Sequence, residues 1–332
     1  GSEPGSLVND DITYVDQDEN GDIWASSFSR GIDKLDIEKG TFTHYRPSEV
    51  KGFDNHSVHA FKIHDNHLYI GYWSHGLSII SLQDGTSRRF RHIPGDSRSL
   101  ASDEVRSLFI DSFNNLWVGT TGGLSLFSDP TGDFTNFIHD EKDPYSIPQG
   151  AIYDITMRGD RQLLVAADQD GVAELNLQNG LFNNAARKFS TVKVGNMTGR
   201  NPVRSIELDS YGNLWIGSFG SGLLFKCGSD DGTDRLLYQT GASDNIPNAV
   251  GFKANGDMLI GYGYGDVALV RDQMLLKSYP RNDANIIIRT ILRDREGRIW
   301  MGGRNSGLFL LNADGSRKVV PGTSDRTDFR VL

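Results

Sequence analysis

Short apolar runs alternate with polar turns along the whole chain. The pattern is clearest in residues 104–138, where apolar residues recur in the runs 105–110, 116–120, 124–127 and 134–137. The segments between these runs contain Asp, Asn and Gly, which favour tight turns. Short runs bounded by turn residues predict β-strands, and no segment has the longer period of an amphipathic helix. We therefore predict a unit of four short antiparallel strands.

The predicted unit is repeated along the sequence. Its second strand contains Leu-Trp-Val-Gly at 116–119 and is followed by Gly-Leu at 123–124. Including this one, seven copies can be recognised, and the tryptophan position is occupied in turn by Trp24, Tyr69, Trp117, Leu164, Trp215, Leu259 and Trp300. Four-stranded units repeated in this way predict a β-propeller. We expect the tryptophans to be buried between neighbouring blades, because one blade alone leaves two apolar faces uncovered.

The predicted fold is all-β, a seven-bladed β-propeller of four-stranded antiparallel blades. The blades are expected at about 11–47, 57–94, 104–138, 151–190, 202–240, 247–280 and 287–320, in one domain of residues 1–322. Residues 323–332 are expected to be a tail or the start of a following module. A horseshoe solenoid would need one strand per repeat, and no copy ends in the Trp-Asp dipeptide of another propeller class.

The segments that join the blades are repeated as well. Ser6-Leu7, Ser99-Leu100 and Ser146-Ile147 each precede the first strand of a blade by the same offset. The residues before the first strand are too few to supply an outer strand to the last blade. We therefore expect the first and last blades to be joined by side-chain packing or by residues 323–332.

Composition limits the classes of function. The chain has 332 residues and a net charge of −9, which argues against non-specific binding to nucleic acid or to an anionic membrane surface. No apolar run approaches the length needed to span a bilayer. Cys227 is the single cysteine, so an intrachain disulfide is excluded.

The repeated motif resembles the two-component regulator propeller repeat. The resemblance rests on an Asp-x-x-Gly turn, the Trp-x-Gly strand, the following Gly-Leu and the Ser-Leu connector, in phase over nearly the whole chain. It implies a periplasmic sensor region of a hybrid two-component system, in which a histidine kinase and a response regulator follow the ectodomain. It also implies a domain that senses glycans and controls polysaccharide utilisation. None of the other modules of that family is found in this sequence.

Three motifs suggest chemistry that the sequence supports poorly. Residues 16–22 match the first part of an EF-hand calcium loop, but Ser27 stands where that loop needs a bidentate acid, so a plain turn is expected. Blade two contains a histidine cluster, but strand geometry would bring at most two of its members together, and we expect no metal site. Its members are His56, His59, His64, His67 and His75. Cys227 has no evident catalytic partner, and no serine lies in a nucleophile elbow.

Alignment of the blades predicts a candidate ligand site at one rim. One position near the start of the first strand is polar or basic in every copy: Thr13, His59, Arg106, Tyr153, Arg204, Asn248 and Arg289. The loops after the second strands are expected at the same rim, and they add aromatic and planar polar groups that suit sugars. The resulting candidate residues are Tyr72, Trp73, His75, Arg106, Tyr153, Asp168, Gln169, Arg204, Phe219, Tyr262, Tyr264, Arg289, Arg304 and Asn305. The alternatives are that the arginines pair with acids such as Asp103 or Glu104, and that the aromatics pack between blades or contact another protein.

We therefore expect a periplasmic binding module, the ectodomain of an inner-membrane receptor, that recognises an oligosaccharide, with an acidic one as an option. Its other expected partner is a neighbouring propeller or a second protomer, with no nucleic acid and no membrane contact by this domain. A structural propeller that transmits the signal without touching ligand is the first alternative. A lyase or hydrolase is the second, and would need two facing carboxylates among Asp103, Asp168 and Asp170. We expect no catalytic residue, metal or cofactor.

Overall fold

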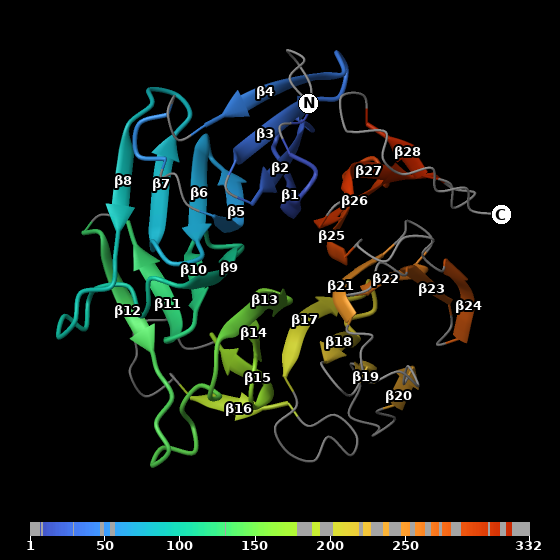
Figure 1. Cartoon of the computed structure of the whole chain (residues 1–332). Coiled ribbons are helices and arrows are strands. Elements are labelled where there is room, and N and C mark those ends of the chain that lie inside the picture. Colours follow the sequence, from blue (N-terminus) through green and yellow to red (C-terminus); the bar gives the residue numbers. More distant parts are fainter. Residues whose placement is uncertain are drawn as a thin grey trace. The chain divides into compact units, whose positions relative to one another are not determined.

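The computed structural model describes most of the chain as short β-strands (Figure 1). The described residues are 7, 9–28, 30–46, 50–53, 57–129, 131–177, 188–192, 202–218, 222–226, 235–238, 247–252, 256–262, 267–271, 274–279, 287–304, 306–312 and 317–320. Within them, seven four-stranded sheets are formed, and each sheet uses four consecutive strands paired in sequence order. The prediction of an all-β propeller built from small four-stranded antiparallel blades is confirmed. The assignment of all seven to one domain of residues 1–322 stays a prediction, and residues 323–332 lie outside the described part.

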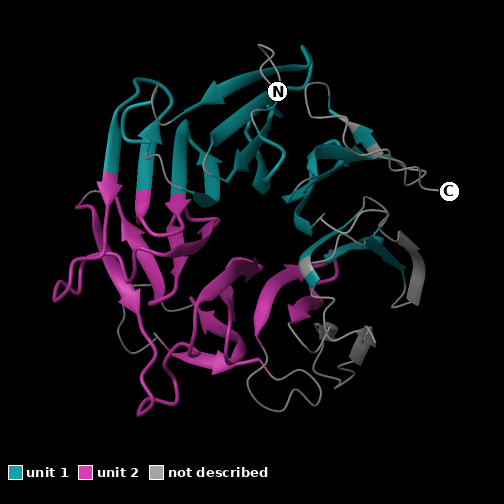
Figure 2. Cartoon of the chain, in the orientation of Figure 1, with its two compact units in different colours: residues 1–70, 78–88, 242–332 teal, residues 71–77, 89–241 magenta. Residues whose placement is uncertain are grey.

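The chain divides into two compact units (Figure 2). Unit 1 comprises residues 1–70, 78–88 and 242–332. It contains the first sheet, with β1 (Ile12–Gln17), β2 (Ile23–Ser27), β3 (Gly31–Asp36) and β4 (Thr41–Tyr45). It also contains the sixth sheet, with β21 (Pro247–Phe252), β22 (Met258–Tyr262), β23 (Val267–Arg271) and β24 (Met274–Tyr279). The seventh sheet completes it, with β25 (Ile287–Arg293), β26 (Ile299–Arg304), β27 (Gly307–Leu311) and β28 (Arg317–Val319).

Unit 2 comprises residues 71–77 and 89–241. The third sheet has β9 (Val105–Ile110), β10 (Leu116–Thr120), β11 (Gly123–Ser128) and β12 (Asp133–Phe137). The fourth has β13 (Ile152–Arg158), β14 (Gln162–Ala167), β15 (Gly171–Asn176) and β16 (Phe189–Thr191). The fifth has β17 (Val203–Leu208), β18 (Leu214–Ser218), β19 (Gly222–Lys226) and β20 (Arg235–Tyr238). The strands of the second sheet contain residues of both units, and they are β5 (Val58–His64), β6 (His67–Tyr72), β7 (Leu77–Ser81) and β8 (Ser87–Phe90).

The constant spacing between Asp and Trp in the repeats has a direct structural cause. Asp111 follows β9, and its Oδ1 accepts hydrogen bonds from the backbone N–H groups of Phe113 and Asn115, both at 2.9 Å. Its Oδ2 accepts a bond from Nε1 of Trp117 on the following strand, at 2.9 Å. Three other sheets have the same Asp–Trp bond at 2.8–3.1 Å, in the pairs Asp18–Trp24, Asp209–Trp215 and Asp294–Trp300. One carboxylate thus forms the turn and satisfies the buried indole donor.

The predicted burial of tryptophans between neighbouring sheets is confirmed for Trp117 and Trp300. In unit 2, Trp117 is fully buried in a cluster that also contains Ile152, Leu163 and Phe189 of the fourth sheet. In unit 1, Trp300 of the seventh sheet is buried with Ile12 and Ile23 of the first. In both pairs one sheet is covered by apolar residues of the next, which is how a propeller buries the faces of its blades.

The two Ser-Leu and Ser-Ile connectors of unit 2 make the same set of hydrogen bonds. The Ser99 hydroxyl accepts a bond from the backbone N–H of Ile93 at 2.9 Å, and the Ser146 hydroxyl accepts one from that of Asp140 at 3.1 Å. In both connectors, Nδ1 of a histidine lies at hydrogen-bond distance from the backbone carbonyl oxygen of the residue after the serine. The pairs are His92–Leu100 at 2.8 Å and His139–Ile147 at 2.9 Å. Leu100 and Ile147 are buried. The repeated Ser-Leu motif thus fixes the segment that leads into the first strand of the next sheet.

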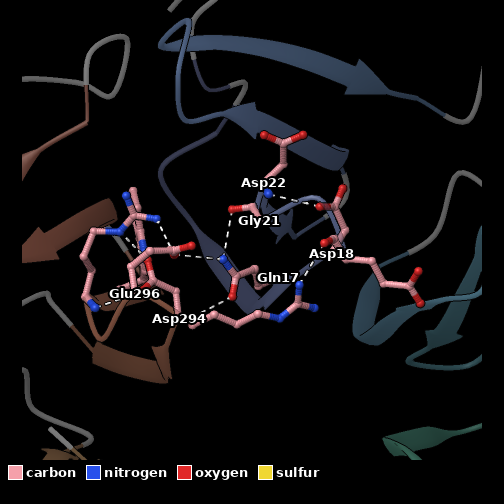
Figure 3. Close-up of polar contacts among 10 residues, drawn as sticks. Gln17, Asp18, Gly21, Asp22, Asp294 and Glu296 are labelled. Atoms are coloured by element: carbon pink, nitrogen blue, oxygen red, sulfur yellow. Dashed lines mark hydrogen bonds and ion pairs between the residues drawn. The ribbon is translucent and has the colours of Figure 1, made fainter. Parts of the chain in front are cut away.

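The first and last sheets of the chain contact each other within unit 1. Besides the apolar cluster, the amide of Gly307 donates to the carbonyl of Asp10 at 2.8 Å. At the other end of the strands, Gln17 Oε1 accepts a bond from the backbone N–H of Arg295 at 2.9 Å, and Gln17 Nε2 reaches Glu296 at 3.4 Å (Figure 3). The outer strand of the last sheet is β28, from the same C-terminal region. Side-chain packing, one of the two predicted ways of joining these sheets, is observed, whereas residues 323–332 lie outside the described part. In the described residues no strand is exchanged between the two sheets.

Candidate functional site

The predicted rim position is the extra residue of a repeated β-bulge. Among the described strand pairings, the register between the first and second strands shifts near the start of the first strand in six sheets. The extra residue at each shift is Thr13, Arg106, Tyr153, Arg204, Asn248 or Arg289. A bulge bends its strand and redirects the side chain of the extra residue, and such bulges are frequent beside functional sites. The sequence alignment found these positions without indicating the bulge.

Arg106 is held between an aromatic ring and a carboxylate in unit 2. Its guanidinium carbon lies 4.1 Å from the centroid of the Trp73 ring, in a cation–π contact. Its Nη2 donates to Glu104 Oε2 at 2.6 Å. Arg106 is 7% exposed, whereas Trp73 is 47% exposed. The cation is therefore largely covered, and the ring is what reaches solvent.

Arg204 has the same kind of surroundings in the same unit. Its guanidinium carbon lies 3.9 Å from the centroid of the Tyr153 ring, and its Nη2 lies 3.4 Å from Asp168 Oδ1. Tyr153 and Arg204 stand on neighbouring first strands, β13 and β17. Thus both bulge arginines of unit 2 combine with an aromatic ring and an acid. The predicted alternative of arginines paired with acids is confirmed for Arg106 and Glu104.

The bulge residues of unit 1 are used differently. Arg289 Nη1 donates to Asp11 Oδ1 at 2.8 Å, which adds to the contact between the last and first sheets. The Thr13 hydroxyl lies 2.7 Å from that of Ser26 and donates to the carbonyl of Val58 at 3.0 Å. These side chains hold sheets together, so a ligand role is better supported in unit 2.

Two predicted ligand residues are corrected by their burial. Tyr72 and Tyr262 are 0% and 2% exposed, so the expectation that their rings lie open at the rim is wrong. Each is the last residue of a second strand, where Thr120 and Ser218 of other sheets are also buried. The small buried residues at the equivalent positions were the signal that could have identified these tyrosines as core.

The other candidates are distributed as follows. Asp168, Gln169 and His75 are half-buried, and His75 Nδ1 lies 2.9 Å from the Ser74 hydroxyl. Arg304 is exposed. Phe219, Tyr264 and Asn305 lie outside the described residues, as do Cys227, His56 and the side chain of Asn248.

The calcium-like turn of the first sheet contains a lysine in place of a metal. Lys34 Nζ lies 2.9 Å from both Asp18 Oδ2 and Asp22 Oδ2, and Figure 3 shows the two acids in this turn. Burial by itself would raise the pKa of Asp18, but hydrogen bonds from Trp24 and Lys34 outweigh it and keep that pKa below its ordinary value. Burial would likewise lower the pKa of Lys34, and its bonds to Asp22 and Asp18 raise it instead. The cluster is a satisfied structural ion pair.

In the described part of the chain, no group of three or more His, Cys, Asp or Glu side chains is arranged to hold a metal ion. No helix long and apolar enough to cross a membrane occurs among those residues.

Comparison with known proteins agrees with this architecture. The family described as two component regulator propeller matches residues 99–122, 199–220 and 282–305. Each match covers a tryptophan-bearing second strand or the approach to it, so the chain carries two-component regulator propeller repeats, and the resemblance inferred from the motif is confirmed. No curated protein sequence matches.

Several solved structures share the fold. The extracellular domain assigned to the hybrid two component system BT3049 from B. thetaiotaomicron is 25% identical, with a TM-score of 0.57, over 96% of this chain and 40% of that one. The corresponding domain of BT4673 from the same organism is 21% identical, with a TM-score of 0.70, over 93% and 38%. Virginiamycin B lyase from Staphylococcus aureus is 14% identical, with a TM-score of 0.68, over 92% and 95%. This chain therefore spans about 40% of the length of the sensor ectodomains.

Proposed function

We propose that the chain is a ligand-sensing propeller in the periplasmic ectodomain of a hybrid two-component receptor, and that its ligand is an oligosaccharide. The observation that carries the proposal is the pair of arginine, aromatic and carboxylate groups at the bulges of unit 2. Oligosaccharide sites combine an aromatic surface with a few fixed polar groups, and both are found at Trp73 and Tyr153. The similarity to sensor ectodomains supports the same class of function.

A purely structural role is the second candidate. Phe113 and Tyr211 are 61% and 87% exposed, and both stand in turns between a first and a second strand, at the opposite end from the bulges. Exposed aromatic residues are enriched at protein interfaces. Under this hypothesis the propeller contacts a neighbouring propeller or a second protomer. It then transmits a conformational change that is caused by ligand bound to another domain.

We propose no catalytic role for the domain. The carboxylates that a hydrolase would need are engaged with other groups. Asp103 accepts bonds from Arg91 and from the backbone N–H of His92, and Asp170 accepts one from the backbone N–H of Gln149. Asp168 is paired with Arg204. A general acid or a nucleophile would have to leave these partners before reacting.

Isothermal titration calorimetry tests the binding function. The 332-residue chain is titrated with gluco-, manno-, galacto- and xylo-oligosaccharides and with acidic oligosaccharides that carry uronic acid or sulfate groups. Saturable heat with at least one member, without release of shorter products on chromatography, is the expected result. Absence of binding to every member, repeated with the complete ectodomain, would leave the structural role as the better account. Formation of shorter products would favour the enzyme.

A further inference from the structure

Trp73 differs from the other tryptophans of the chain. The sequence has five, and the remaining four, Trp24, Trp117, Trp215 and Trp300, are between 0% and 6% exposed. Those four are fixed by the Asp–Trp bonds of the repeat. Trp73 lies outside the repeated motif, in the turn after β6, and is 47% exposed. A half-exposed tryptophan offers a large apolar surface on which a ligand can stack.

Arg106 fixes the orientation of this exposed ring. The guanidinium lies against one face of Trp73 at 4.1 Å and is itself 7% exposed. The bulge in β9 directs Arg106 to this place, and the bond to Glu104 holds the guanidinium there. A ring whose rotation is restricted before binding loses less conformational entropy when a ligand stacks on it.

The charges around Trp73 favour an uncharged ligand. The positive charge of Arg106 is already compensated by Glu104 at 2.6 Å. The Glu104 side chain is 46% exposed and that of Arg106 is 5% exposed, so an approaching ligand meets the carboxylate more readily than the cation. The net charge of −9 acts in the same direction. Arg204, the other bulge arginine of unit 2, is similarly paired with an acid, Asp168.

We propose that the Trp73 ring, oriented by Arg106, is the stacking surface for a neutral sugar ring, and that Glu104 excludes acidic sugars from it. This inference rests on the proposed oligosaccharide-binding function and assigns its ligand class. Trp73 contacts the ligand, Arg106 is a positioning residue, and Glu104 determines specificity while offering a hydrogen-bond acceptor to sugar hydroxyls. It chooses a neutral oligosaccharide over the acidic one that the sequence left as an option.

Tryptophan fluorescence gives a test that reads Trp73 alone. Acrylamide should quench mainly this residue, because the other four are buried, and a bound neutral oligosaccharide should reduce that quenching. Trp73→Ala should remove the quenchable fraction and weaken calorimetric binding at least tenfold, as is usual for a central aromatic contact. Phe113→Ala, which removes an exposed aromatic at the other end of the strands, should leave both measurements unchanged.

The charge selection is tested with matched ligands. Neutral xylo-oligosaccharides and the same chains bearing a glucuronic acid branch differ by one carboxylate, and glucose oligomers with and without uronic acid units form a second pair. The neutral member of a pair should bind more tightly to the wild-type chain. Glu104→Gln keeps a hydrogen-bonding group but removes the charge. It should reduce the ratio of neutral-ligand to acidic-ligand affinity by about fivefold. Arg106→Lys keeps the charge but loses the planar stack, so quenching of free Trp73 should increase and neutral-ligand binding should weaken.

The outcomes separate this inference from the function on which it rests. If no oligosaccharide binds at all, both are wrong. If oligosaccharides bind with unchanged affinity to Trp73→Ala and leave the wild-type quenching unaltered, the ligand lies elsewhere and only the stacking surface is wrong. If the acidic member binds more tightly, or Glu104→Gln leaves the difference unchanged, the role of Glu104 is wrong. Thermal unfolding of each variant identifies loss of binding that results from loss of the fold.

Discussion

At the scale of single residues, the repeat is held by buried carboxylates whose partners differ between sheets. The carboxylate that accepts the indole bond is also paired with Lys34 in the first sheet and Arg298 in the seventh. In the third sheet the additional donor is the amide of Asn115, at 2.9 Å from Asp111 Oδ2. The same turn is therefore stabilised with and without a neighbouring cation.

Asp18 should make the stability of the protein depend on pH. Its pKa is lower in the folded than in the unfolded chain, so the folded state binds fewer protons and its stabilising contribution is present at neutral pH. That contribution is lost as pH falls below the unfolded value of about 3.9 and through the folded pKa. Asp18→Asn should lower the free energy of unfolding at pH 7 by about 1–3 kcal/mol.

Urea unfolding between pH 7 and pH 3 measures this dependence. The difference between wild type and Asp18→Asn should shrink as the pH falls, because protonation removes the charge that the variant lacks. Glu38→Gln, an exposed charge removed from the same sheet, is the matched control and should follow the wild type. A difference that stays constant across the pH range would contradict the assigned role of Asp18.

The sequence predicted some of these residue environments and missed others. Burial of Trp117 followed from an aromatic residue in a repeated strand. Its bond to Asp111 did not, because the two residues are joined only when the turn brings the end of one strand beside the next. Tyr72 was placed at the surface by its position in an expected loop, whereas the strand continues through it and carries its ring into the interior.

At the scale of elements, the glycine of the Trp-x-Gly motif allows the next sheet to approach. A Cβ on Gly119 would lie 2.6 Å from the carbonyl oxygen of Ile152 on β13 and closer still to the Ser107 hydroxyl. Gly261 and Gly302 are closed in by Ile288 and Ile12 in the same way within unit 1. The glycine of the motif is thus required by close contact between sheets, because a side chain at this position would push the two sheets apart.

Gly119→Ala should consequently destabilise the protein by about 1–3 kcal/mol, the usual cost of overpacking a core. The fourth sheet has Ala166 at the equivalent position, so Ala166→Gly is the natural comparison and should cost about 1 kcal/mol through a lost methyl group and added chain entropy. Denaturant unfolding gives both values, and hydrogen exchange should report weakened protection of β13 for Gly119→Ala. A Gly119→Ala variant as stable as the wild type would show that close approach at Gly119 is unimportant.

The strands were predictable and the bulges were not, for a physical reason. Alternating apolar positions bounded by turn residues indicate a half-buried strand wherever they occur. One extra residue in such a strand leaves the residues on either side of it paired with the next strand, as Val105 and Ser107 are around Arg106. The sequence therefore looks like an uninterrupted strand. The alignment of repeats found the polar position, and the pairing of the strands was needed to explain how its side chain is directed.

At the scale of the whole molecule, the repeat determines the sheets but gives little information about the ligand. Residues that recur, such as Trp117 and Gly119, serve contact between sheets. Residues that do not recur, such as Trp73 and Glu104, form the candidate site. Sequence comparison within the chain could separate these two classes. It could not predict that Glu104 neutralises Arg106, because that depends on side-chain geometry at a bulge.

The contact between the first and last sheets is expected to depend on apolar packing more than on its polar bonds. Ile12 is 0% exposed and lies in the cluster that contains Trp300 and Leu308, whereas the Gln17 bonds to Arg295 and Glu296 are exposed. Ile12→Ala should lower the free energy of unfolding by about 2–5 kcal/mol. Gln17→Ala should cost no more than about 1 kcal/mol, because water replaces its partners. Hydrogen exchange after Ile12→Ala should increase in β1 and in β25–β27 together, since both sides of the contact lose packing. An increase confined to β1–β4 would mean that the last sheet is stable without the first.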